Sequence, residues 1–502
     1  MDVPPTGSPE PRRRPKPWAR RLLIGVNVLV ALALIASVAV YGYVRYRNGQ
    51  ITREKVAGLT TGESSGSPMT ILLVGSNTRT GLDPAEIQQF GSATEVGGAR
   101  SDVTMLVHLD PKTKTVTLLS LPRDLFIPVP GTDKLQRVDA ALNNGPGALV
   151  EVIQNDLGIP INHFVELNFD SFQSVVNSLG GLDMQFPTAV RDSFSGLNLK
   201  AGCLHLNGKT ALAVVRARHL EYYETGRFHP DPYGDLSRIR RNHEFLRVLA
   251  KAVQNQGVNS PLTLNSIVGN LAPKLKVDSG LSLTTMVDLA RRFRSVDVAA
   301  VPQTTLPVVL AAGYRFDGVN YGDVVLPSAP LDQQAVAQFL GASAPAPSSS
   351  AAAVSIVNES GTSSAAARTE QGLRALGWTI ADATTKPVPA NPAESIIYYP
   401  PGKLAAAQHL LQQLSGSIGL GVATVPGADL QLVIGSDLKV TGGVPPATTT
   451  TTTTQPSVTS ARGRVTTTTQ PQGVMVNGDV VTVQDSPQPF DPTSCPAGVK
   501  GH

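Results

Sequence analysis

The sequence lacks the short motifs that mark several common classes of enzyme. It contains no Gly-x-x-x-x-Gly-Lys phosphate loop, no paired Cys motif and no two histidines in a His-x-x-x-His spacing. Its net charge is only +4 over 502 residues, and no basic stripe with interleaved aromatics occurs. These absences argue against a P-loop nucleotide hydrolase, a zinc or dithiol enzyme and a nucleic-acid-binding protein.

One long hydrophobic run dominates the N-terminal part of the chain. Residues 22–44 are almost wholly apolar, with Asn27 the only strongly polar side chain, and about 20 such residues are enough to span a bilayer. Basic residues flank the run on both sides, with a modest excess before it. We therefore expect a cytoplasmic disordered tail (1–21), a transmembrane helix (22–44) and an extracytoplasmic remainder, hence a single-pass protein of the cell membrane. A cleaved signal peptide is the alternative.

Composition divides the remainder into two folded units and three polar segments. Residues 45–68 are rich in Gly and Ser and predict an extracytoplasmic stalk. Strand and helix patterns alternate through 69–342 and again through 354–440, which predicts α/β folds for both units, the second one small. The Ala/Pro/Ser run at 343–353 predicts a linker. Residues 441–502, with two threonine runs amid prolines, predict a disordered tail.

The chain has only two cysteines, Cys203 and Cys495. Both lie on the expected outer side of the membrane, where disulfides persist. A bond between them would tie the C-terminal tail to the first folded unit. Sequence does not show whether two cysteines are close in space, so pairing and two free thiols both stay open.

Arginines recur beside aspartates along the first folded unit. The guanidinium fork suits phosphate oxygens, and carboxylates suit a hard cation that bridges them. The pattern therefore predicts a site for a substrate linked through pyrophosphate. The runs are Arg100-Ser101-Asp102, Arg123-Asp124, Arg216-Ala217-Arg218 and Asp235 to Asn242.

Local periodicity suggests how two of these runs are arranged. Leu212 to Leu220 predicts a strand, in which Arg216 and Arg218 share one face. Asp235 is placed as the N-cap of the next helix, whose residues Arg238, Arg241 and Asn242 can face one site at i, i+3 and i+4. The N-terminus of such a helix also favours a bound anion, in addition to the arginines. His219 and His229 bracket a segment that we interpret as an inserted loop near this site.

The order of these motifs resembles the LytR-CpsA-Psr family of membrane-anchored bacterial enzymes of cell-wall assembly. The resemblance extends over about residues 69 to 255 and implies a three-layer α-β-α domain with a central sheet. Residues 354–440 resemble the LytR C-terminal domain that is often attached to actinobacterial members. The matching runs in the first unit are Met69–Arg79, Arg100–Asp102, Leu119–Asp124, Arg137–Ala141, Phe169–Asp183, Leu206–Leu212 and the arginine runs above.

The resemblance implies a reaction and roles for individual residues. Members of the family move a glycopolymer from a polyprenyl-pyrophosphate carrier to a peptidoglycan hydroxyl, as a phosphodiester, with Mg²⁺ (or Mn²⁺). Asp102 matches the carboxylate tied to the metal and to activation of the hydroxyl, and Arg100 matches the arginine of the Arg-Ser-Asp motif. The expected pyrophosphate-binding residues are Arg123, Arg216, Arg218, Arg238, Arg241 and Asn242. The expected partners are the lipid-linked glycan, peptidoglycan and membrane lipid, with arabinogalactan the first polymer to consider.

One departure from the family pattern bears on function. Asn77 stands where the family commonly has an Asp next to the metal. Asn offers a neutral oxygen to a cation but brings no charge. We keep Asn77 with Asp102 as the expected metal ligands. A non-catalytic scaffold that binds lipid pyrophosphate or wall polymer, and a polyprenyl pyrophosphatase, are the alternatives to a transferase.

Overall fold

The computed structural model describes residues 42, 45–46, 48–61, 66–78, 100–128, 135–232, 234–255, 274–316, 319–341, 352–386, 394–442, 480–481, 488–496 and 498–501. The chain divides into two compact units, one ending at Ile51 and one beginning at Thr52. The expected cytoplasmic tail and, apart from Gly42, the expected transmembrane helix lie outside the described residues. No helix within the described residues has the length and apolar character needed to cross a membrane.

A mixed seven-stranded sheet forms the centre of the first domain. Three neighbouring strands of this sheet are antiparallel: β2 (Met69–Ser76), β3 (Ser101–Asp110) and β4 (Thr115–Leu121). On its other side, β2 pairs in parallel with β7 (His163–Leu167). The apolar runs at 71–76, 103–109 and 116–121 predict buried strands from the sequence, and the structure confirms all three. The full order is β1 (Thr52–Glu54), β14 (Lys276–Asp278), β7, β2, β3, β4 and β15 (Gln303–Thr305).

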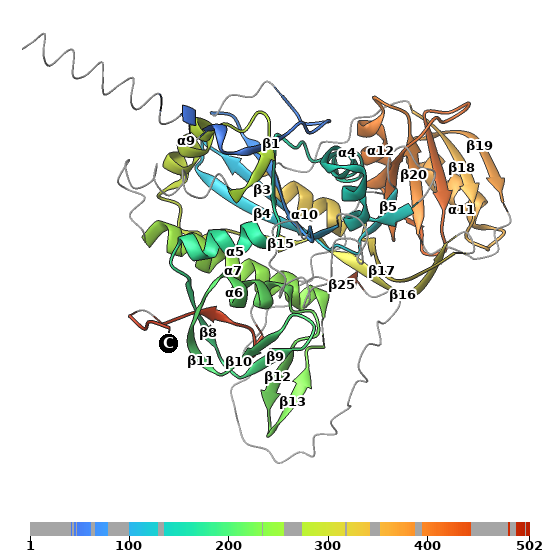
Figure 1. The fold of residues 1–502 in the computed structure, drawn as a ribbon. Coiled ribbons are helices and arrows are strands. Elements are labelled where there is room, and N and C mark those ends of the chain that lie inside the picture. Colours follow the sequence, from blue (N-terminus) through green and yellow to red (C-terminus); the bar gives the residue numbers. More distant parts are fainter. Residues whose placement is uncertain are drawn as a thin grey trace, which may run out of the picture. The chain divides into compact units, whose positions relative to one another are not determined.

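Helices cover both faces of this sheet. Successive side chains of a strand point to opposite faces, and apolar residues on each face pack against helices. Leu72 and Val74 pack in one core with α4 (Pro146–Leu157) and α10 (Leu331–Phe339). Ile71 and Leu73 contribute to the opposite face, against α9 (Leu283–Phe293) and α7 (Asp235–Asn255). The three-layer α-β-α prediction is therefore confirmed (Figure 1).

Part of the expected stalk belongs to the sheet. β1 pairs in parallel with β14 at its edge, and Thr60 N donates to Ile161 O at 2.8 Å. Val56 and Leu59 pack against the main core. The prediction of a stalk through residue 68 is wrong for these residues, because scattered apolar side chains anchor a stretch whose composition is otherwise polar.

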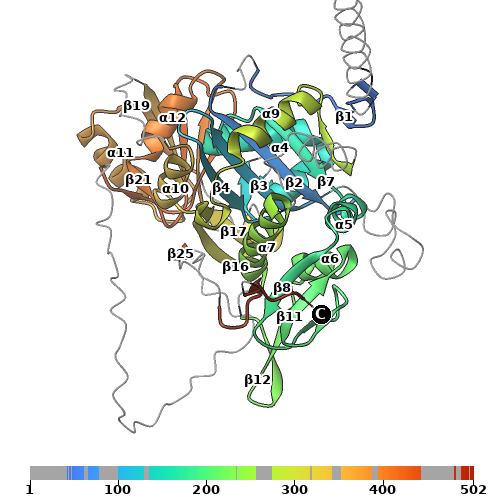
Figure 2. The same ribbon diagram turned by 90° about the vertical axis from the view of Figure 1, so that its left-hand side faces the viewer.

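A second lobe continues from the sheet and carries two helices and several short strands (Figure 2). The strand predicted at Leu212–Leu220 is wrong, because Gly208–Arg216 is helix α6. The side chain of Asn207 caps this helix by accepting a hydrogen bond from Thr210 N at 2.9 Å, and alanines favour the helix. The remaining elements are α5 (Phe169–Ser178), β8 (Leu182–Phe186), β9 (Val190–Asp192), β10 (Leu197–Leu199), β11 (Gly202–Leu206), β12 (Glu221–Glu224) and β13 (Arg227–Pro230).

The C-terminal domain is a small α/β unit, as predicted. A five-stranded sheet packs its apolar face against two helices. Ala352 is buried and Ala353 opens the first strand, so the last two residues of the predicted linker belong to this domain. Its described elements are β18 (Ala353–Asn358), α11 (Ala365–Ala375), β19 (Thr379–Thr385), β20 (Ser395–Tyr399), α12 (Leu404–Leu411), β21 (Leu414–Ser415), β22 (Ile418–Val422), β23 (Leu430–Ile434) and β24 (Lys439–Val440).

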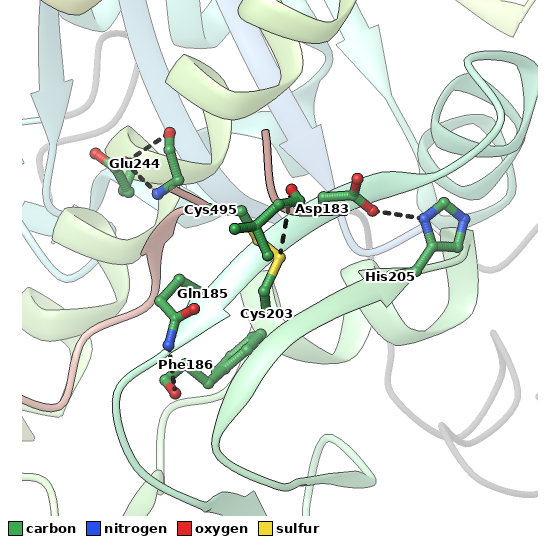
Figure 3. Close-up of a disulfide and its surroundings, with 9 residues drawn as sticks. Asp183, Gln185, Phe186, Cys203, His205, Glu244 and Cys495 are labelled. Carbon is green, nitrogen blue, oxygen red and sulfur yellow. Dashed lines mark hydrogen bonds and ion pairs between the residues drawn. A yellow bond between two sulfur atoms is a disulfide. The ribbon is translucent and has the colours of Figure 1, made fainter. Parts of the chain in front are cut away.

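The end of the chain returns to the second lobe. A disulfide joins Cys203 of β11 to Cys495, with Cα atoms 5.6 Å apart (Figure 3). Next to it, β26 (Thr493–Ser494) extends the sheet of β8 and β11. Phe490 stacks on Tyr222 with ring centroids 4.2 Å apart. Of the two alternatives left open for the cysteines, the structure shows the disulfide. The prediction of disorder is wrong for the described residues after 487.

Buried carboxyl groups at the junction of the two domains predict how stability depends on pH. Burial raises the pKa of Asp156 and of Asp332 to about 7, whereas such a group titrates near pH ~4 in the unfolded chain. Between about pH 4 and pH 7 the folded protein therefore binds more protons, so the free energy of unfolding falls as pH rises. We expect guanidinium unfolding to show a loss on the order of a few kcal/mol from pH 5 to pH 8.

The variant Asp332→Asn tests this assignment. It removes one titrating group, so its stability should fall less steeply over the same pH window. Asp429→Asn is the matched control, because Asp429 is a more exposed carboxylate of the C-terminal domain whose pKa is lowered by Lys403. An unchanged slope in Asp332→Asn would contradict the assignment.

Candidate active site

A β-bulge places Asp102 at the end of strand β3. Gly75 pairs with Val103 and Ser76 pairs with Ser101, so Asp102 is an extra residue in the ladder between β2 and β3. Bulges of this kind turn a side chain out of the regular alternation and are common beside active sites. The bulge thereby separates Asp102 from the two core-facing rows of its strand.

The amide of Asn77 closes the same ladder. Its side-chain oxygen accepts a hydrogen bond from Arg100 N at 2.9 Å, and its backbone N donates to Arg100 O at 3.1 Å. Asn77 is buried. This residue therefore shapes the turn before Asp102, and its carbonyl oxygen already has one donor.

Two predicted arginines contact Asp102 from different elements. Arg123, which follows β4, pairs through Nη1 with Asp102 Oδ1 at 3.0 Å. Arg238, on the first turn of α7, donates from Nη2 to the backbone oxygen of Asp102 at 2.7 Å. Burial lowers the pKa of Arg238, yet a guanidinium remains protonated in proteins. Two fixed positive charges thus lie beside the bulge.

A third predicted arginine joins this cluster through Asp124 and Asp235, which were not among the predicted site residues. Arg218 Nε lies 3.1 Å from Asp235 Oδ1, and Asp235 Oδ1 also lies 3.0 Å from Arg238 Nη2. Arg218 Nη2 lies 4.0 Å from Asp124 Oδ2. The structure therefore brings together residues from β3, the turn after β4, the end of α6 and the start of α7. The two aspartates lie close to predicted arginines in the sequence, and this position could have identified them as site residues.

Helix α7 does not present all three of its predicted residues to one site. The guanidinium of Arg241 pairs with Asp231 Oδ2 at 2.7 Å and donates to Ala217 O, and both side chains of the ion pair are 1% exposed. The common-face prediction is wrong for Arg241, because a buried carboxylate just before the helix binds it. Asn242 is buried on the same helix, and its role in binding stays a prediction.

Two further predicted residues lie at the edges of the cluster. Arg216 ends α6, and its guanidinium lies 4.4 Å over the ring of Phe169. Arg100 is close to Asp139, with Nη1 3.7 Å from Oδ2. Their roles in substrate binding and catalysis stay predictions.

Asp139 is a site residue that sequence reasoning did not select. Its side chain is fully buried, and neither carboxylate oxygen has a hydrogen bond within the described part of the chain. Burial raises its pKa. The Arg137-Val138-Asp139 run that helped to carry the family resemblance was the signal that could have identified it.

Asp102 and Asp139 are carboxylates near the bulge that could hold a magnesium ion, which stays a prediction. Mg²⁺ is commonly held by one or two carboxylates together with phosphate oxygens and water. Asp102 supplies one accessible carboxylate, and the orphaned oxygens of Asp139 mark a place where a cation would satisfy buried acceptors. Within the described residues, no group of three or more His, Cys, Asp or Glu is arranged as a complete protein cage.

Two relatives are similar in sequence to about half of this chain. The chain is 29% identical over 254 residues to the "Probable cell wall biosynthesis protein LcpB" of Corynebacterium glutamicum, covering 50% of this chain and 57% of that protein. It is 31% identical over 248 residues to the polyisoprenyl-teichoic acid–peptidoglycan teichoic acid transferase TagV of Bacillus subtilis, covering 46% and 58%. The chain thus spans less than two thirds of the length of these two relatives.

One solved structure and two family profiles are also similar to this chain. A LytR-Csp2A-Psr enzyme from Actinomyces oris aligns with a TM-score of 0.45 at 28% identity, covering 58% of this chain and 95% of that one. Residues 351–438 match the profile described as LytR cell envelope-related transcriptional attenuator. The profile of the LytR_cpsA_psr family matches residues 39–332, which is more than half of the sequence, and the chain therefore belongs to the LytR_cpsA_psr family.

Proposed function

We propose that this protein transfers a glycopolymer from a polyprenyl-pyrophosphate carrier to a hydroxyl of peptidoglycan. The observation that carries the proposal is the bulged Asp102, held between Arg123 and Arg238. Phosphoryl transfer requires mainly positioning and neutralisation of negative charge, and these groups can provide both. The names of the relatives, which include a teichoic acid transferase acting on peptidoglycan, support the same reaction.

In the proposed reaction, Arg123, Arg218 and Arg238 bind the pyrophosphate oxygens and orient the phosphorus that carries the sugar. The acceptor oxygen forms a bond to that phosphorus while the bond to the bridging oxygen breaks. Polyprenyl phosphate leaves with the electron pair, and Asp102 accepts the proton of the attacking hydroxyl. Asp102, with Asn77 and Asp139 near it, would hold Mg²⁺ or Mn²⁺, which supplies further neutralisation of phosphate charge when bound.

We further propose that the catalytic domain lies outside the cell, anchored by residues 22–44 with the N-terminus in the cytoplasm. The disulfide between Cys203 and Cys495 supports this location, because disulfides persist in oxidising compartments. Arabinogalactan and teichoic acid are the two polymers to compare. The first follows from the actinobacterial character of the resemblance, and the second is named in several relatives.

Product analysis with the full-length protein in detergent tests the proposal. The protein is incubated with a synthetic polyprenyl-pyrophosphate glycan and a peptidoglycan fragment, with and without Mg²⁺. We expect a phosphodiester product and free polyprenyl phosphate, and at least a roughly hundredfold loss of both in Arg218→Ala. Arg292→Ala is the control, because Arg292 is an exposed residue of α9 paired with Asp288.

The alternatives predict different products. A pyrophosphatase would release the phosphorylated glycan without joining it to any acceptor. A scaffold would bind the lipid-linked glycan without consuming it, whatever acceptor or metal is supplied. Either result would overturn the transferase proposal.

A further inference from the structure

The turn between β9 and β10 holds an exposed aromatic ring. Phe194 is 71% exposed, although burying such a side chain contributes about 1.5–3 kcal/mol. Its backbone is fixed nonetheless, since Asp192 Oδ1 accepts hydrogen bonds from Phe194 N at 2.9 Å and Ser195 N at 3.1 Å. Asp192 itself is 1% exposed. A buried carboxylate therefore holds this ring out towards solvent.

The same carboxylate joins the turn to the segment that follows α6. Asp192 Oδ2 accepts a hydrogen bond from His219 N at 2.9 Å. The imidazole of His219 lies against the ring of Phe194, with centroids 4.4 Å apart and planes tilted by 37°. The two exposed rings form one surface, which we name the Phe194–His219 platform.

The platform adjoins the phosphate-binding cluster. His219 follows Arg218 directly, and consecutive Cα atoms are about 3.8 Å apart. Arg218 pairs with Asp235, which in turn pairs with Arg238 beside Asp102. The platform and the phosphate-binding cluster are therefore built on adjacent residues of one segment.

The chemistry around the platform favours a sugar over a lipid chain. Arg191, three residues before Phe194, and Glu221, two residues after His219, form a partly exposed ion pair between β9 and β12. The chain on either side of the platform is therefore polar, and the platform is not part of a wide apolar patch. A pyranose combines an apolar face of C–H groups with a rim of hydroxyls. A phenyl ring beside an imidazole matches that combination, since the phenyl ring can contact the apolar face while the imidazole can hydrogen-bond to a hydroxyl.

We propose that Phe194 and His219 form the subsite for the sugar attached to the pyrophosphate of the donor. The proposal rests on the function proposed above and names the part of the substrate that this surface recognises. Tyr223, on the same four-stranded sheet, serves as the control position for Phe194. It is also exposed (45%), but its ring contacts Phe228 and it lies five residues beyond Arg218.

Calorimetric titration of the full-length protein with two probes tests the subsite. One probe is a short-chain prenyl pyrophosphate, and the other is the same compound bearing an N-acetylhexosamine on its terminal phosphate. We expect Phe194→Ala to raise Kd for the sugar-bearing probe roughly 3- to 10-fold, with Kd for the bare pyrophosphate unchanged. Phe194→Trp should retain the affinity, and Tyr223→Ala should alter neither Kd.

The outcomes separate this inference from the proposed function. Equal weakening of both probes by Phe194→Ala, or weakening of the bare pyrophosphate alone, would overturn the sugar subsite and indicate a lipid contact or a disturbed fold. No effect on either probe would overturn it as well. Failure of the proposed phosphate site would show separately, as an unchanged Kd for the bare pyrophosphate in Arg218→Ala.

Discussion

Replacing Asp102 with asparagine should lower the rate of glycopolymer transfer by about 10²- to 10⁴-fold, the usual contribution of a general base. The amide keeps the shape of the side chain but cannot accept the proton of the attacking hydroxyl. It also removes the charge opposite Arg123, whose Nη1 lies 3.0 Å from the carboxylate. Initial rates of polyprenyl phosphate release, measured at saturating donor, check this expectation.

Asp110 offers a matched control at the opposite end of the same strand. It ends β3 in a turn, where its carboxylate accepts a hydrogen bond from Lys112 N. Asp110→Asn should leave the transfer rate within about twofold of the native value, as expected for a surface position. Equal rates in Asp102→Asn and the native protein would remove Asp102 from the proposed mechanism.

Replacing Asp231 with alanine should lower the free energy of unfolding by about 3–5 kcal/mol, because it leaves a buried charge without its partner. The guanidinium of Arg241 lies 2.7 Å from Asp231 Oδ2, and only 1% of each side chain is exposed. Asp491 is a further carboxylate, 4.0 Å from this guanidinium, and it also pairs with Arg240. Chemical unfolding with the disulfide intact, followed by circular dichroism, measures the change.

Two variants separate the buried pair from general effects of losing a carboxylate. Asp288→Ala breaks an exposed i,i+4 pair with Arg292 and should cost less than about 1 kcal/mol. The double variant Asp231→Leu with Arg241→Met removes both charges and should recover much of the lost stability. A loss in Asp231→Ala no larger than that in Asp288→Ala would show that the pair does not stabilise the lobe.

Local patterns were sufficient for much of the architecture. The strands at 71–76 and 116–121 were predictable because apolar residues that serve two cores form short continuous runs. The alternation of strands and helices in the C-terminal domain was predictable for a similar reason, since buried apolar residues repeat with the period of the helix or strand that contains them. The order of the motifs was sufficient to identify the family.

Local patterns misled where a cap or a distant partner decided the outcome. Leu212–Leu220 contains many residues that suit a strand, but the side chain of Asn207 starts a helix just before it. Arg241 was expected beside the substrate and instead binds Asp231 in the interior. Strand β22 was hard to predict because it contains Gly419 and Gly421, and glycine is rare in strands. Side chains of other elements pack close to both glycines.

By itself, the sequence determined the family, the α/β class and the set of arginines and aspartates available for phosphate chemistry, because these depend on residue identity and on periodicity along the chain. Only the tertiary structure decided which of them meet. A β-bulge places Asp102 between Arg123 and Arg238. Arg241 forms a buried ion pair instead of facing the site, and Cys495 is bonded to Cys203. These outcomes depend on contacts between residues far apart in the chain, where burial makes pairing of charges obligatory.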